Sequence, residues 1–106
     1  KGSNLNIPLP EKTDGAAYRK ALKAAIARIR RHKPGFLVVC LGLDTAKGDP
    51  TGTWSLRSAD FRAVGALVRS LGLPTLVVQE GGYDNRVLGT NARAFFQGFA
   101  GEEKKA

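Results

Sequence analysis

The chain has 106 residues, of which 42% are hydrophobic and 25% charged, and 17 basic residues against 9 acidic ones give a formal net charge of +8. This length allows one domain at most, and the composition is typical of a globular protein rather than a disordered one. The longest apolar run, residues 36–41, is too short to span a membrane, and one cysteine with one histidine excludes a disulfide framework and a zinc site made of these two residue types.

Residues 1–13 are polar and contain Pro8 and Pro10. Because the residue before a proline avoids the helical region, we expect an extended loop or an edge strand here. No apolar stretch of the kind found in a secretory signal follows the basic first residue. We therefore expect a cytoplasmic protein.

The next segment has the pattern of an amphipathic helix. Asp14 is a suitable N-cap, apolar residues recur at helical spacing from Tyr18 to Ile29, and Pro34 and Gly35 end the pattern. Seven of the 17 basic residues lie between Arg19 and Lys33. Cations near the C-terminal end of a helix complement its dipole, which favours a solvated face, and we expect His32 to be a surface residue.

Two other interpretations of the basic helix stay open. It could attract an anionic partner or an acidic part of a larger protein, or it could bind nucleic acid through phosphate contacts. The chain has no nucleic-acid motif and no aromatic residues interleaved with the basic ones. We therefore do not expect a nucleic-acid partner, and we expect no membrane partner.

Two apolar segments have the pattern of buried strands. Residues 36–41 are uniformly apolar and rich in branched side chains, and residues 76–78 repeat this pattern after Pro74. Such runs are typical of parallel strands buried on both faces, and Cys40 within the first run is expected to be a small core residue. Between them, Ser58 is the predicted cap of a second helix that ends at Gly72.

A third helix is predicted by an apolar stripe from Leu88 to Phe99, and residues 102–106 form a charged tail that we expect to be frayed. A strand, a helix and a second strand in this order form a crossover unit with parallel strands. The predicted fold class is α/β, a parallel sheet with flanking helices in three layers (α/β/α). Residues 1–106 would form a single, partial domain with two to three strands and three helices.

Polar segments follow both predicted strands. Asp44 lies in the first, residues 42–50, and Tyr83 ends the second, residues 79–83. Ligands of open parallel sheets bind beyond the carboxyl ends of the strands, so the side chains of Asp44 and Tyr83 are expected to face one small cavity if their strands are neighbours.

These segments, together with residues 4–10 and 88–92, resemble the C-terminal part of the zinc-dependent deacetylases, the family of histone deacetylases and acetylpolyamine amidohydrolases. The resemblance covers almost the whole chain. It implies an arginase-deacetylase fold and an amide hydrolase that acts on acetylated lysine, acetylated polyamines or similar amines. It also implies a catalytic zinc ion as cofactor.

The resemblance assigns roles to particular residues. Asp44 would be a carboxylate ligand of the zinc ion, and Tyr83 would be the catalytic residue that donates a hydrogen bond to the oxyanion. Gly81 and Gly82 would let the backbone bring Tyr83 close to the substrate, because a side chain there would obstruct it. These glycines, with Gly42 and Leu43, would form the substrate pocket. Asp49 and Pro50 would shape the turn of the Asp44 loop.

The family's paired catalytic histidines and its Asp-x-His zinc ligands have no counterpart in this chain. One carboxylate cannot hold a catalytic zinc ion, which normally has three protein ligands, so we expect the chain to be inactive alone. An incomplete sheet would expose strand edges, which favours self-association.

The alternative function is a non-catalytic binding or scaffold module that uses the basic helix. A receiver-like or flavodoxin-like domain is disfavoured, since it needs more strands and an acidic or phosphate-binding loop.

Overall fold

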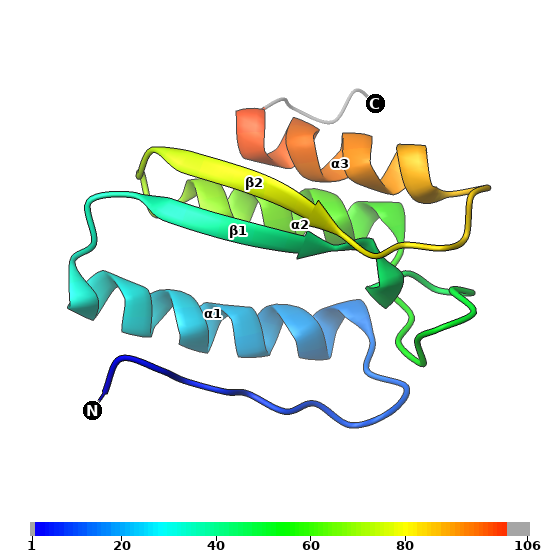
Figure 1. Ribbon diagram of the computed structural model, residues 1–106, viewed down its shortest axis with the longest axis horizontal. Coiled ribbons are helices and arrows are strands. Elements are labelled where there is room, and N and C mark those ends of the chain that lie inside the picture. Colours follow the sequence, from blue (N-terminus) through cyan, green and yellow to red (C-terminus); the bar gives the residue numbers. More distant parts are fainter. Residues whose placement is uncertain (1, 102–106) are drawn as a thin grey trace.

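The computed structural model describes residues 2–101, and the predicted frayed tail lies outside this range. Three helices, two strands and one 3₁₀ turn follow one another along the chain (Figure 1). In chain order they are α1 (Gly15–His32), β1 (Leu37–Gly42), η1 (Leu43–Thr45), α2 (Ser58–Arg69), β2 (Thr75–Glu80) and α3 (Leu88–Ala100). Residues 2–10 contain no helix or strand.

The two strands form a parallel sheet, and α2 connects them. The ladder runs from the pair Leu37–Thr75 to the pair Gly42–Glu80, so both strands end at the same level. This arrangement confirms the predicted α/β class, with a parallel sheet and three helices. It also confirms that the two polar segments follow neighbouring strands.

Helix α1 begins and ends where the sequence predicts. The carboxylate of Asp14 accepts a hydrogen bond from the backbone N–H of Ala17 (2.9 Å), which satisfies one of the free donors at the helix start. At the other end Lys33 adopts the left-handed conformation (φ 54°), and Pro34 follows directly. His32 is exposed, as predicted.

Helices α2 and α3 pack closely because glycines lie at their crossing. A Cβ atom on Gly65 of α2 would lie 2.1 Å from the carbonyl oxygen of Phe95, and one on Gly98 of α3 would lie 1.9 Å from the carbonyl oxygen of Arg62. Next to this crossing Phe61 and Phe95 are almost completely buried. The two helices therefore form one layer that covers the sheet.

The predicted cap of α2 is wrong. The residue that caps this helix is Arg57, whose backbone N–H donates to the carboxylate of Asp60 (2.8 Å). Ser58 is the first helical residue, and its hydroxyl donates to the side-chain oxygen of Asn91 in α3 (2.8 Å). The Ser58 hydroxyl therefore binds a side chain of a distant helix, whereas the sequence predicts that it binds the backbone at the start of α2.

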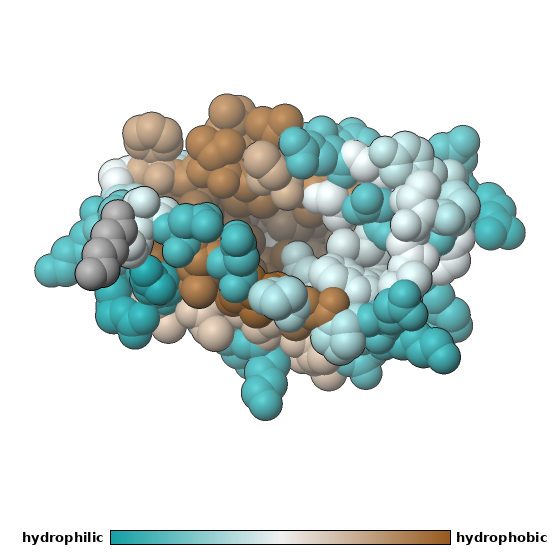
Figure 2. Space-filling view, turned by 60° about the horizontal axis from the view of Figure 1, so that its bottom comes forward, coloured by the Kyte–Doolittle hydropathy of each residue, from teal (hydrophilic) through white to brown (hydrophobic). Residues whose placement is uncertain are grey.

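The prediction that the strands are buried on both faces is also wrong. Alternate residues such as Val39 and Val77 pack against the core between the sheet and the helices. On the opposite face Val38 is 51% and Leu76 61% exposed, and Cys40 is exposed rather than in the core. The physical reason is that α2 and α3 pack on one face of the sheet. Figure 2 shows hydrophobic residues (brown) gathered around a hollow on one side of the molecule.

Trp54 anchors the long segment between η1 and α2 to the N-terminal residues. Its indole N–H donates to the carbonyl oxygen of Pro10 (3.0 Å), and the centroids of its ring and the Tyr18 ring lie 5.8 Å apart in an edge-to-face arrangement. No helix within residues 2–101 has the length and apolar character needed to cross a membrane.

Candidate functional site

The candidate site lies where the two strands end. Gly42 and Glu80 form the last pair of the parallel ladder. The 3₁₀ turn with Asp44 follows β1 directly, and Gly81 follows β2 directly. The two polar segments that the sequence singles out therefore leave the sheet side by side.

The Asp44 carboxylate occupies a space that two glycines leave free. A Cβ atom on Gly81 would lie only 2.9 Å from Oδ2 of Asp44, and one on Gly42 would lie 3.1 Å from Oδ1. Asp44 is half-buried and borders a hollow of about 380 Å³ lined by residues 45 and 51–54. The backbone after both strands thus cradles this carboxylate at the edge of an open space.

Gly82 also requires the absence of a side chain. Its φ of 116° lies in a region that other residues rarely adopt. A Cβ atom there would lie 2.8 Å from Cβ of Leu43 and 2.7 Å from a methyl carbon of Leu88. Leu43 itself is only 2% exposed and belongs to the core. Core side chains on both sides therefore hold the Gly-Gly segment.

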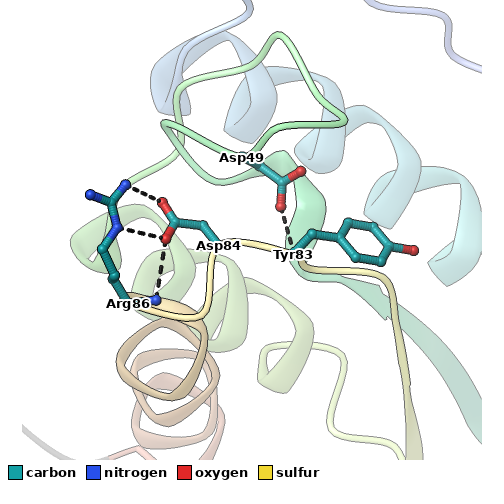
Figure 3. Close-up of polar contacts among 4 residues, drawn as sticks. All are labelled: Asp49, Tyr83, Asp84 and Arg86. Atoms are coloured by element: carbon teal, nitrogen blue, oxygen red, sulfur yellow. Dashed lines mark hydrogen bonds and ion pairs between the residues drawn. The ribbon is translucent and has the colours of Figure 1, made fainter.

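Asp49 joins the two polar segments. Its side chain is buried, with 5% of the residue exposed. Oδ1 accepts hydrogen bonds from the backbone N–H (2.8 Å) and the hydroxyl (2.7 Å) of Thr51, and Oδ2 accepts one from the backbone N–H of Tyr83 (2.8 Å; Figure 3). Burial alone would raise the pKa of this carboxyl, but the hydrogen bonds from Tyr83, Thr51 and the backbone N–H of Asp84 outweigh it and lower the pKa.

Asp84, the residue after Tyr83, holds the start of the next turn. Its carboxylate accepts hydrogen bonds from the backbone N–H (3.2 Å) and the guanidinium Nε (3.1 Å) of Arg86 (Figure 3). The hydrogen bond from the Arg86 side chain is the main cause that lowers the pKa of the Asp84 carboxyl. The same carboxylate lies against Gly48, where a Cβ atom would come within 3.3 Å of Oδ2.

Tyr83 is 56% exposed. In Figure 3 its ring points away from Asp84 and Arg86. The structure therefore brings Asp44 against Gly81, and Asp49 against the backbone of Tyr83. That the side chains of Asp44 and Tyr83 face one cavity stays a prediction.

The donor set for a metal ion is small. Within residues 2–101 no three His, Cys, Asp or Glu side chains lie close enough together to hold a metal ion. Asp49 already uses both carboxylate oxygens in hydrogen bonds. Asp44 lies in its glycine cradle, and its role as one carboxylate ligand of a metal ion stays a prediction.

A family model decides the relationship of the chain to known proteins. The model of the histone deacetylase domain matches residues 1–99. The chain belongs to the histone deacetylase family. Its residues are 43% identical, over 94% of the chain, to "Acetylpolyamine amidohydrolase 2" of Pseudomonas aeruginosa, and 40% identical, over 92% of the chain, to an acetylpolyamine amidohydrolase of Burkholderia pseudomallei.

Solved structures of histone deacetylase relatives agree with this assignment. A crystal structure of the acetylpolyamine aminohydrolase from Burkholderia pseudomallei superposes with a TM-score of 0.88 at 39% identity, covering 92% of this chain. The chain spans 29% of the length of the two curated relatives and 28% of that crystallised chain. The resemblance inferred from the sequence, including its restriction to part of the family domain, is therefore confirmed.

Two features of this histone deacetylase segment escaped sequence reasoning. The spacing of Asp49 and Thr51 is that of a local turn, which the structure contains, but the bond from Tyr83 to Asp49 joins residues far apart in sequence. The sequence pattern around Asp84 indicates its role even less clearly. An Asp two residues before an Arg is common, and only the burial of its side chain, 8% exposed, distinguishes it.

Proposed function

We propose that the chain is part of a zinc-dependent amide hydrolase that deacetylates an acetylated amine. The observation that carries the proposal is the Asp44 carboxylate, held between Gly42 and Gly81 at the shared end of the two strands. Because the chain belongs to the histone deacetylase family, we infer that this carboxylate is a ligand of the zinc ion.

The residues of the chain would act in three ways. Asp44 would supply one carboxylate ligand to the zinc ion. Tyr83 would donate its phenolic hydrogen bond to the substrate carbonyl oxygen as that oxygen gains negative charge. Gly81 and Gly82 would let the backbone pass close to Asp44 and Leu43 and so bring Tyr83 to the substrate. The pocket roles of these glycines, Gly42 and Leu43 stay predictions. When bound, zinc would polarise the carbonyl and lower the pKa of a water molecule towards about 7.

The proposed substrate is an acetylated amine, which water would cleave into acetate and the free amine. Two relatives that share 40% and 43% of their aligned residues with the chain are acetylpolyamine amidohydrolases, which supports acetylated polyamines. Acetyl-lysine is the other candidate, because the matching family model is that of the histone deacetylase domain.

We expect the isolated chain to be inactive, because one carboxylate is too few for a catalytic zinc site. Purified residues 1–106 should release no acetate from acetylated polyamines and should retain no stoichiometric zinc after gel filtration. Metal analysis by mass spectrometry checks the second point. Turnover with bound zinc would contradict this expectation.

A chimera tests the proposed roles. Residues 1–99 would replace the matching segment of the Burkholderia pseudomallei amidohydrolase, whose structure superposes with a TM-score of 0.88. Turnover by this chimera is expected. Tyr83→Phe should lower kcat about 10²- to 10³-fold, the usual cost of losing an oxyanion donor, and leave the zinc content unchanged, whereas Asp44→Ala should lower the zinc content.

Matched substitutions away from the site control for general damage. Tyr18→Phe removes the same hydroxyl from a half-buried ring beside Trp54, and Asp14→Ala removes a carboxylate that caps α1. Both should leave kcat and the zinc content of the chimera within about twofold. If Tyr83→Phe released zinc and Asp44→Ala reduced only turnover, the assigned roles would be refuted.

A further inference from the structure

The two residues before Tyr83 bring no side chains of their own that could fix its backbone. Gly81 and Gly82 both have positive φ angles, 63° and 116°, and neither carries a side chain that could lock the segment in place. The Tyr83 ring cannot do so either, because 56% of the residue is exposed. The position of Tyr83 must therefore be fixed through its backbone.

Asp49 provides that fixed point. It is the buried carboxylate on the opposite segment, and its Oδ2 accepts the backbone N–H of Tyr83 at 2.8 Å (Figure 3). Its other oxygen is held by the N–H and the hydroxyl of Thr51. Hydrogen bonds to an ionised carboxylate are about twice as strong as neutral ones, so this bond ties Tyr83 to the turn that Asp49 forms with Thr51.

We propose that Asp49 is a positioning residue, which fixes the backbone of Tyr83 and through it the place of the phenolic hydroxyl beside the substrate carbonyl. The role of Tyr83 in this inference rests on the proposed function. The hydrogen bond from the Tyr83 N–H to Asp49, called the tether below, does not. An ionised carboxylate is required because both of its oxygens must accept. An amide at position 49 offers one acceptor oxygen and one NH₂ group. The oxygen keeps more bonds on the side of Thr51, which donates two, so the NH₂ group would face the backbone N–H of Tyr83.

The tether is tested in the 106-residue chain by hydrogen exchange of single backbone amides, followed by two-dimensional NMR. In Asp49→Asn the Tyr83 amide should exchange about tenfold faster or more, since a hydrogen bond to a charged group is lost. Amides of the β1–β2 ladder should be unchanged, which reports an intact fold. Thr51→Val is the control, because it removes the hydroxyl bond to Oδ1 and keeps the bond from Tyr83 to Oδ2.

An equal increase of the Tyr83 amide exchange rate in Thr51→Val and Asp49→Asn would overturn the tether. An unchanged exchange rate of this amide in Asp49→Asn would overturn it too. If Asp49→Asn prevents folding, Asp49→Glu serves instead. It keeps the charge but displaces the carboxylate by one methylene, and faster exchange at Tyr83 with an unchanged ladder is again expected.

Kinetics of the chimera test the positioning role. Asp49→Asn should lower kcat about 10- to 100-fold, because a catalytic group misplaced by about 1 Å costs that much, while KM and the zinc content stay within twofold. A loss of zinc in proportion to kcat would overturn positioning. If the chimera with all of these residues intact is inactive, the proposed function fails, while the amide exchange still decides whether the tether exists.

Discussion

The Asp44 carboxylate lies where two glycines leave room for it, and this dependence can be measured. Gly81→Ala would place a Cβ atom 2.9 Å from Oδ2 of Asp44 at a φ of 63°. Gly72→Ala is a matched control, since Gly72 has a φ of 65° with nothing within 4 Å of its Cβ position. Both should lose about 1–2 kcal/mol from the left-handed backbone.

Only Gly81→Ala should displace the carboxylate as well. Its free energy of unfolding in urea should therefore fall further than that of Gly72→Ala, and in the chimera it alone should lower the zinc content. Equal effects of the two substitutions would show that Gly81 serves only the backbone conformation.

Asp49 makes the stability of the chain depend on pH. Its pKa is lowered in the folded state relative to about 3.9 in the unfolded state. The stabilisation is therefore fully present above pH 3.9 and is lost as the pH falls through the lower, folded-state pKa. Urea unfolding between pH 6 and pH 2 should show that the difference in free energy of unfolding between the native chain and Asp49→Asn becomes smaller towards low pH. A difference that does not depend on pH would contradict the hydrogen bonds assigned to the carboxylate.

Single residues also show which features of the site can be predicted from the sequence. Asp44 and Tyr83 follow predicted strands, so their neighbourhood could be predicted once the strands were placed. The bond from Asp49 to Tyr83 could not, because it depends on how two long loops fold against each other. The capping role of Asp60 was hidden by Ser58, which is the commoner cap but binds Asn91 instead.

Among the secondary-structure elements, the crossing of α2 and α3 depends most directly on particular residues. Gly65→Ala and Gly98→Ala would each drive a methyl group into the backbone of the other helix. We expect each to lower the free energy of unfolding by about 1–3 kcal/mol or more, as overpacking does. This loss should exceed the gain of about 1 kcal/mol that alanine brings to a helix.

Gly89→Ala is the control for this pair, because Gly89 lies in α3 with nothing within 4 Å of its Cβ position. It should leave the stability unchanged or raise it by up to about 1 kcal/mol. Denaturant titrations of the three variants decide the point. A loss in Gly89→Ala as large as in Gly98→Ala would exclude close helix packing as the cause.

The elements themselves were largely predictable. Helical spacing, the Asp14 cap and Pro34 define α1, and the apolar runs define both strands. The burial of the strands was not predictable in the same way. An apolar run indicates a strand, but whether both of its faces are covered depends on where the helices pack. The exposure of Val38 and Cys40 is therefore visible only in the structure.

For the molecule as a whole, we propose that the exposed face of the sheet drives self-association. Val38, Leu76 and Val78 are 51%, 61% and 42% exposed on this face, and contiguous apolar surfaces of this kind mark interaction sites. Sedimentation velocity should show larger species as the concentration rises. Leu76→Lys should shift the distribution to the monomer.

Ala24→Lys controls for added charge, since Ala24 is an exposed residue of α1 and the native chain already carries a net charge of +8. It should leave association unchanged. Equal dissociation by both substitutions would assign the effect to charge repulsion, and a native chain that is monomeric at every concentration would refute the proposal.

The parallel pairing of β1 and β2 has a consequence for the order of folding. Parallel neighbours cannot be joined by a tight turn, so Leu37 pairs with Thr75 across the whole connection through α2. Contacts between residues so far apart in the chain form slowly, whereas the helices need only local contacts. The cradle of Asp44 and the bond from Asp49 to Tyr83 would then be among the last parts to assemble during refolding.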